Sequence, residues 1–131
     1  MRYLLDANAV IGLLNDRGSR LAARARQESP SDLAISAIVT HELFYGAFKS
    51  GRVGQSLSLI DALQFPVLAF DKEDARRAGE IRAFLIGKGT PIGAYDVLIA
   101  GQALARSMVL VTHNTREFIR VPGLKLEDWE S

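Results

Sequence analysis

Short apolar runs and longer stretches of helical periodicity alternate along the whole chain. A short run that is apolar throughout is typical of a strand buried on both faces of a parallel sheet. Such runs predict strands at 2–5, 33–36, 66–70 and 108–111, with a last edge strand at 124–126.

Between these runs, apolar residues recur at the three- and four-residue spacing of amphipathic helices. Ser19 and Asp71 stand where helix N-caps are expected, because their side-chain oxygens can accept a backbone N–H. In the helix after Asp71, periodicity places four residues toward the core: Ala75, Ala78, Ile81 and Leu85. The predicted helices are 9–14, 20–28, 37–49, 53–63, 72–86 and 94–106, with one helical turn expected within 112–118.

The order of these elements predicts an α/β fold. Each strand is followed by a connection long enough for a crossover helix, which favours a central parallel sheet flanked by helices. The segment 87–93 holds three glycines and a proline and is therefore expected to be a loop. With no repeat or linker in sight, we expect a single domain spanning 1–131.

Composition narrows the function classes. The chain has 131 residues, is 48% hydrophobic and has no cysteine, so disulfides and thiolate metal sites are excluded. No apolar run approaches the ~20 residues that span a membrane, and no signal peptide is evident, so a cytoplasmic protein is expected. A net charge of +1 does not favour nucleic-acid binding by bulk charge, so such binding would need a local basic patch.

Three acids lie inside otherwise apolar stretches, next to a strand end or a helix start: Asp6, Glu42 and Asp96. Acids in such places are partly buried and need a partner. If they converge, two carboxylates ~4 Å apart repel by roughly 4 kcal/mol at an effective dielectric near 20. A divalent cation would relieve that repulsion, and all-oxygen ligands favour Mg²⁺ or Mn²⁺.

Each acid also has an ordinary structural interpretation. Asp6 is a suitable helix N-cap, Glu42 suits a solvated helix face, and Asp96 suits the positive end of its helix. Asn114 and Glu117 add polar groups after the apolar run that ends at Val111. The spacing alone leaves the metal site and the structural roles open.

Four stretches together resemble the PIN-domain ribonucleases, and in particular the VapC toxins of bacterial type II toxin–antitoxin pairs. They span nearly the whole chain, and the last two resemble most the VapC group that cuts initiator transfer RNA. The stretches are Tyr-Leu-Leu-Asp-Ala-Asn at 3–8, Ile-Ser leading to His-Glu-Leu-Phe-Tyr-Gly at 35–46, Pro-Ile-Gly-Ala-Tyr-Asp-Val-Leu-Ile-Ala at 91–100, and Leu-Val-Thr-His-Asn-Thr-Arg-Glu-Phe at 110–118 with Val-Pro-Gly-Leu at 121–124.

This resemblance implies a PIN-like three-layer α/β/α fold and a homodimer. It implies Mg²⁺- or Mn²⁺-dependent endonucleolytic cleavage of RNA, with initiator tRNA cut in the anticodon stem-loop as the expected reaction. It also implies inhibition by a cognate VapB antitoxin, whose C-terminal segment enters the active-site groove, and a higher assembly with that antitoxin.

Carried over residue by residue, Asp6, Glu42 and Asp96 match the three family acids and are the expected metal ligands. Many PIN domains have a fourth acid after the last long strand. Here Asn114 or Glu117 would take that place, and both join the expected catalytic set. The resemblance also implies accessory roles for three polar residues: Asn8, Ser36 and Thr112.

The expected mechanism is a metal-assisted in-line attack of water on an RNA phosphate. Asp6 and Asp96 would hold one metal, and Glu42 would reach it directly or through water. The RNA backbone would meet Lys49, Arg52, Lys88, Arg116 and Arg120, and His113, Tyr45 and Tyr95 are candidates for phosphate contact or base stacking.

Two competing interpretations fit part of this pattern. A phosphoacceptor receiver domain has similar length and strand-end acids, but it would show paired acids after the first strand, where this chain has only Asp6. A PIN-fold binding module without nuclease activity would use the same acids to dock a basic partner. The complete set of three acids favours the nuclease.

Overall fold

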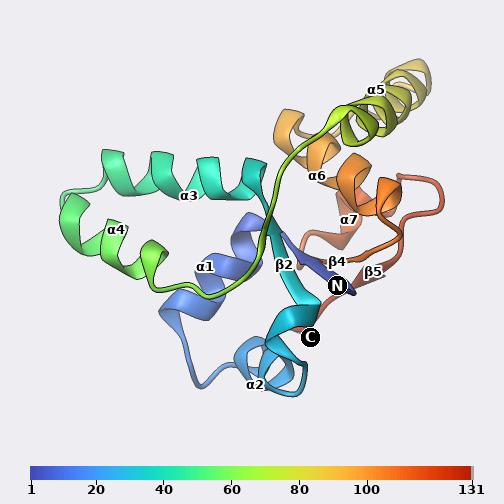
Figure 1. Ribbon diagram of the computed structural model, residues 1–131. Helices are drawn as coiled ribbons and strands as arrows, with labels where there is room; N and C mark the ends of the chain where they lie inside the picture. Colours follow the sequence, from blue (N-terminus) through green and yellow to red (C-terminus); the bar gives the residue numbers. More distant parts are fainter. Residues whose placement is uncertain (131) are drawn as a thin grey trace.

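Five parallel strands form one sheet in the order β3-β2-β1-β4-β5 in the computed structural model, which describes residues 1–130 (Figure 1). The first strand of the sequence is therefore the central one, paired with β2 on one side and β4 on the other. The strands are β1 Tyr3–Leu5, β2 Leu33–Ser36, β3 Val67–Leu68, β4 Val109–Val111 and β5 Leu126–Glu127.

Seven α-helices within the described residues connect and flank this sheet, with α3 lying beside α4 and α5 beside α6 (Figure 1). This arrangement confirms the predicted helix–sheet–helix architecture. The helices are α1 Ala7–Asn15, α2 Arg20–Arg26, α3 Ala37–Lys49, α4 Val53–Asp61, α5 Lys72–Gly87, α6 Ala94–Ala105 and α7 Thr115–Phe118, and a 3₁₀ turn, η1, covers Pro30–Asp32.

Most predicted boundaries agree within two residues, and β2 and α3 agree at both ends. The strand predicted at 66–70 was too long, because β3 pairs with β2 only where Ile35 meets Val67 and Ser36 meets Leu68. The predicted edge strand at 124–126 lies instead at β5, where the partner of Val111 is Glu127. Pairing with a neighbour, and not local composition, sets these two lengths.

Three hydroxyl or carboxyl side chains start helices as expected from their type. The Ser19 hydroxyl accepts the backbone N–H of Ala22, and Asp71 forms a reciprocal capping box with Asp74. Ser36 ends β2 and caps α3 by accepting the N–H of Ile38 at 3.0 Å. Because that cap follows the strand directly, α3 begins at the carboxyl edge of the sheet.

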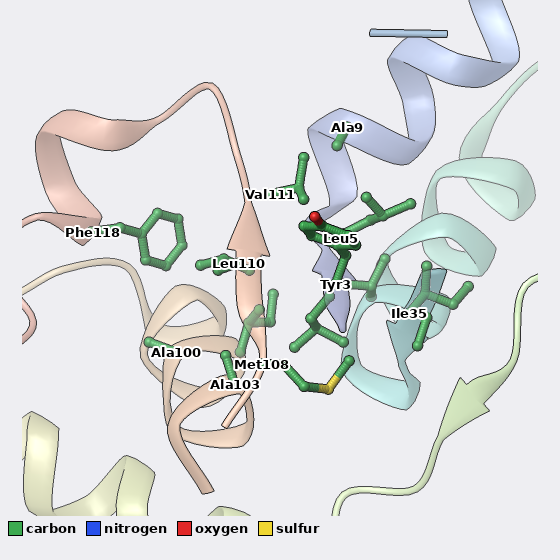
Figure 2. Close-up of a cluster of buried hydrophobic side chains, with 14 of the residues drawn as sticks. Tyr3, Leu5, Ala9, Ile35, Ala100, Ala103, Met108, Leu110, Val111 and Phe118 are labelled. Carbon is green, nitrogen blue, oxygen red and sulfur yellow. The ribbon is translucent and has the colours of Figure 1, made fainter. Parts of the chain in front are cut away.

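The hydrophobic core lies between the central strands and the helices that cover them (Figure 2). Leu4 and Leu5 of β1 and Leu110 of β4 are fully buried, and Phe118 of α7 closes the core on the β4 side. Each such side chain contributes ~1.5–3 kcal/mol by leaving water. The ends of β1 and β4 are therefore rigid supports for whatever follows them.

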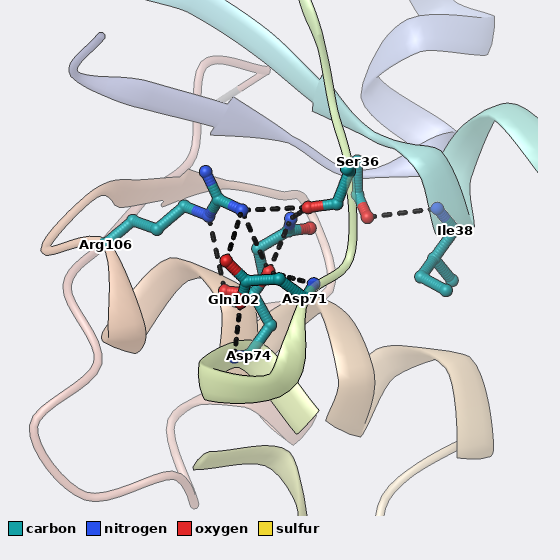
Figure 3. A network of polar contacts seen from close by, with 7 residues as sticks. Ser36, Ile38, Asp71, Asp74, Gln102 and Arg106 are labelled. Carbon is teal, nitrogen blue, oxygen red and sulfur yellow. Dashed lines mark hydrogen bonds and ion pairs between the residues drawn. The ribbon is translucent and has the colours of Figure 1, made fainter. Parts of the chain in front are cut away.

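Helices α5 and α6 pack closely together, and a partly buried ion pair joins Asp74 of α5 to Arg106, the residue after α6 (Figure 3). A Cβ on Gly101 would lie 2.5 Å from the backbone nitrogen of Ala78, so only glycine allows this approach. Asp74 is 1% exposed and accepts bonds from Arg106 at 3.0 and 3.2 Å and from Gln102 at 3.2 Å. The prediction that Ala75 faces inward was wrong: Ala75 is exposed, and the neutralised Asp74 is buried in its place.

Within residues 1–130, no helix has both the length and the apolar character required to cross a lipid bilayer.

Candidate metal centre at the carboxyl edge of the sheet

Asp6 is the residue on which the site is built. It follows β1 directly, its N–H donates to the carbonyl of Val111 at 3.1 Å, and it is only 4% exposed. Its Oδ1 accepts the N–H of Ala9 at 2.8 Å, so it also caps α1. The sequence left a capping role and a metal-binding role open for Asp6; the structure shows the cap and places the residue at the carboxyl edge of the sheet.

The segment after β4 lies beside Asp6. The Thr112 side chain is buried, hydrogen-bonds the Asp6 carboxyl group and accepts the N–H of Asn114 at 2.9 Å. The Asn114 amide donates in turn to Oε2 of Glu117 at 2.9 Å. This chain of bonds ties the first turn of α7 to the end of β1.

Glu42 lies on α3 at the same edge and is half-buried. Its Oε1 is inaccessible and has no hydrogen-bond partner among the described residues. Burial raises the pKa of Glu42, the neighbouring His41 lowers it, and Asp6 raises it further. A buried carboxylate oxygen without a donor is costly, so this atom suits a cation or a bound water.

Asp96 lies in the first turn of α6. Its pKa is raised from 3.8 to about 6, first by burial and then by the negative charges of Glu117, Asp6 and Glu42. Gly93 precedes the helix, and a Cβ there would lie 3.1 Å from Oδ2 of Asp96. A larger residue at 93 would therefore crowd this carboxylate.

The structure thus brings four acids from four elements into one electrostatic cluster: Asp6, Glu42, Asp96 and Glu117. Burial also raises the pKa of Asp6, opposed by its bonds from Thr112 and Ala9. Neighbouring carboxylates raise the pKa of Asp96, and Asp6 raises that of Glu42, so these groups resist ionisation together unless a cation is bound. The oxygen donors and the unpartnered Oε1 of Glu42 fit a hard divalent ion.

The remaining residues predicted to take part in function differ in burial, and most of them are exposed. Ser36 is buried and serves as the cap of α3, while Asn8 is exposed on the first turn of α1. Four basic residues expected to contact RNA are all exposed: Lys49, Arg52, Lys88 and Arg116. Arg120 is exposed as well and donates to the carbonyl of Pro91 at 3.3 Å.

Two features of this edge were missed by sequence reasoning. His41 and Tyr95 stack in a tilted pair with ring centroids 5.3 Å apart, each one residue before a cluster acid. His113 meets Asp128 and Glu130 of the C-terminal segment. Both contacts join residues far apart in sequence, so no local pattern indicates them.

Comparisons with known proteins agree with this geometry. A family model described as PIN domain matches residues 3–124. A tRNA(fMet)-specific endonuclease VapC from Salmonella typhimurium is 39% identical over 131 residues, which cover 98% of each chain. The chain belongs to the VapC family of PIN domains. Ribonuclease VapC1 of Haemophilus influenzae is 36% identical over 132 residues, again 98% of each chain.

The fold comparison extends this result to three dimensions. A crystal structure of DNA-bound VapBC from Salmonella typhimurium contains a chain that matches with a TM-score of 0.93 at 39% identity over 98% of both chains. The four acids of this VapC-family chain therefore sit in a fold shared with proteins named as ribonucleases.

Proposed function

We propose that this VapC-family chain is the toxin of a toxin–antitoxin pair and acts as a metal-dependent endoribonuclease. The observation that carries the proposal is the convergence of Asp6, Glu42, Asp96 and Glu117 at the carboxyl edge of a PIN-domain sheet. Ligands bind at this edge in open α/β folds. The receiver interpretation is excluded by the family match.

Asp6, Asp96 and Glu42 would hold a Mg²⁺ or Mn²⁺ ion in this proposal. Such an ion supplies charge for the phosphate oxygens and lowers the pKa of water, as hydrolysis of a phosphodiester requires. Mg²⁺ retains several waters, so the carboxylates need not all touch it.

The chain's own groups prepare that site. The hydrogen bond from Thr112 orients the Asp6 carboxyl group, and the backbone N–H of Ala9 donates a second hydrogen bond to its Oδ1. The Asn114 amide holds Glu117 beside Asp96, and the side chains of Glu117 and Asp96 hydrogen-bond each other. In the absence of a cation, a proton on Asp96 would offset the repulsion from Glu117.

The proposed substrate is initiator tRNA, cut in its anticodon stem-loop. The support is that the relative from Salmonella typhimurium is named a tRNA(fMet)-specific endonuclease and shares 39% identity over 98% of both chains. Unpaired loop bases are the part of a folded RNA that side chains can reach and stack upon.

The proposed partner is a VapB antitoxin, with a homodimer as the toxin assembly. VapBC complexes from Salmonella typhimurium and Haemophilus influenzae match this chain with TM-scores of 0.93 and 0.91. An apolar groove of about 650 Å³ and exposed aromatic side chains on α3 and α5 suit protein contacts. The groove is lined by residues of α1, α2, β2, α4 and the segment after α4, which include Leu14, Ala22, Leu33, Leu59 and Leu63.

A panel of purified transfer RNAs tests the proposed activity. Wild-type protein, free of antitoxin, is incubated with each RNA in Mg²⁺, in Mn²⁺ and in chelator, beside Asp6→Asn, and the new RNA ends are sequenced. We expect a single cut in initiator tRNA that needs metal and is absent in Asp6→Asn. If neither the panel nor a total RNA pool is cut by folded protein, the binding-module interpretation replaces this proposal.

A further inference from the structure

A second group of metal-ligating side chains lies at the same edge of the sheet, outside the four-acid cluster. Strands β4 and β5 are parallel neighbours, with Val111 paired to Glu127. The residues that follow the two strands therefore leave the sheet side by side. His113 comes two residues after the end of β4, and Asp128 and Glu130 come just after the end of β5.

The side chains of these three residues meet. His113 Nδ1 lies 3.0 Å from Oδ2 and 3.3 Å from Oδ1 of Asp128, and 3.8 Å from Oε2 of Glu130. One ligand atom from each lies within 4.8 Å of the other two. Within residues 1–130 this is the one group of three such side chains that is so tightly gathered.

The C-terminal segment that carries the two acids is anchored. Trp129, between them, is only 6% exposed, and its ring meets that of Tyr3 edge-on with centroids 5.1 Å apart. The Arg24 guanidinium lies over the Trp129 ring at 4.6 Å. The N–H of Glu130 donates to Oδ1 of Asp128 at 3.0 Å, which closes a turn around the tryptophan. The acids are thus held next to the imidazole by a packed core residue.

We propose that His113, Asp128 and Glu130 form a second cation site, for a divalent transition-metal ion of the zinc class. One imidazole with two carboxylates is a donor set that Zn²⁺ accepts, whereas the all-oxygen cluster suits Mg²⁺. The His113 side chain is 64% exposed, which leaves open positions for water or a phosphate oxygen on the ion.

This cation would act on the neighbouring cluster through its charge. His113 directly follows Thr112, whose side chain hydrogen-bonds the Asp6 carboxyl group, so the two sites are adjacent. An ion here would also join the end of β4 to the segment after β5. The bound ion would therefore stabilise the carboxyl edge of the sheet, which is formed by residues from both ends of the chain.

Metal titration tests the site without any RNA. Zn²⁺ is titrated calorimetrically into wild type, His113→Asn and Glu130→Gln, and Co²⁺ is used as a spectroscopic probe of imidazole ligation. Because the chain has 2 histidines, His41→Asn is a matched control on the same edge of the sheet. Asp96→Asn separates this site from the four-acid cluster.

With Mg²⁺ in excess to occupy the four-acid cluster, we expect one Zn²⁺ bound by wild type, by His41→Asn and by Asp96→Asn. His113→Asn and Glu130→Gln should bind it at least about tenfold more weakly, since even outer-shell changes cost that much. In imidazole NMR spectra, Zn²⁺ should shift the signals of His113 and leave those of His41 in place.

Other results would overturn the site. Unchanged affinity in folded His113→Asn, loss of binding in Asp96→Asn, or no Zn²⁺ binding by wild type would each do so. None of these results bears on whether the protein cuts RNA in Mg²⁺, so the proposed function stands or falls separately.

Discussion

Replacing Asp96 by asparagine should make the protein more stable. The pKa of Asp96 is raised from 3.8 to about 6 by burial and by Glu117, Asp6 and Glu42. The folded protein therefore resists ionisation of this group, and at neutral pH it carries that cost. An asparagine has nearly the same shape and no charge, so it removes the repulsion.

The size of the gain in the free energy of unfolding can be calculated from the pKa shift of Asp96. Each pKa unit is worth ~1.36 kcal/mol, so a rise from 3.8 to about 6 sets a ceiling of about 3 kcal/mol. Solvent reaches this half-buried group and screens part of the repulsion. The first turn of α6 also loses a favourable helix-dipole interaction of ~0.3–1 kcal/mol. The expected net gain in the free energy of unfolding is about 1–2 kcal/mol.

The sign of the pH dependence is set by the raised pKa. The contribution of Asp96 to the stability of wild type is greatest below the unfolded-state pKa of 3.8 and is lost as pH rises through the folded-state pKa of about 6. The advantage of Asp96→Asn should therefore be complete above about pH 6 and vanish near about pH 4. Added Mg²⁺ should stabilise wild type and leave the variant nearly unchanged.

Urea unfolding in chelator, at neutral and at acidic pH, measures these quantities. Glu73→Gln is the matched control. Glu73 is an exposed acid in the first turn of α5, so its replacement removes only the interaction with the helix dipole. A variant no more stable than wild type at neutral pH, or equally favoured at acidic pH, would refute the assigned repulsion.

Three further predictions follow from the same contacts. The Mg²⁺ concentration that gives half the maximal rate of RNA cleavage should rise as pH drops below about 6, because a proton on Asp96 then competes with the cation; a half-saturating concentration that stays constant down to pH 5 would argue against Asp96 as a ligand. Glu117→Gln should retain more cleavage than Asp6→Asn in the same assay, since Glu117 is hydrogen-bonded to Asn114 as well as placed beside Asp96; an equally deep loss would make Glu117 a direct ligand. Arg106→Ala should lower the free energy of unfolding by about 3 kcal/mol, because it leaves the carboxylate of Asp74 buried without its cation. Burial raises the pKa of Asp74, but the bonds from Arg106 and Asp71 outweigh it and lower the pKa below its ordinary value. In urea unfolding this loss should therefore be full well above pH 3.8 and shrink as pH falls through the folded-state pKa; a loss that does not change with pH would point to packing instead.

Much of this fold could be predicted from the sequence, because apolar runs, helical periodicity and helix caps are local patterns. The run at 33–36 and the periodic stretch at 37–49 match β2 and α3 at both ends, with Ser36 acting as strand end and cap together. The three acids were identified by their position after a strand or near a helix start. In a parallel sheet the carboxyl ends of all strands lie at one edge. Residues that follow different strands therefore lie close together there, although they are far apart in the sequence.

What could not be predicted depends on partners distant in sequence. Helical periodicity predicts that Asp74 faces solvent. In the structure Arg106, 32 positions away, neutralises the charge of Asp74, so the carboxylate can be buried. The contact of His113 with Asp128 spans 15 positions and needs β4 and β5 to be neighbours. The place of Glu117 beside Asp96 likewise exists only after α6 and α7 have packed.

The most direct test of the central claim is the rate of initiator tRNA cleavage measured against Mg²⁺ concentration, for wild type and for folded Asp96→Asn. For wild type, the rate should rise from zero in chelator to a plateau, whereas Asp96→Asn should show no cleavage at any Mg²⁺ concentration. Cleavage that persists in chelator, or a full plateau in Asp96→Asn, would contradict a catalytic cation held by these acids.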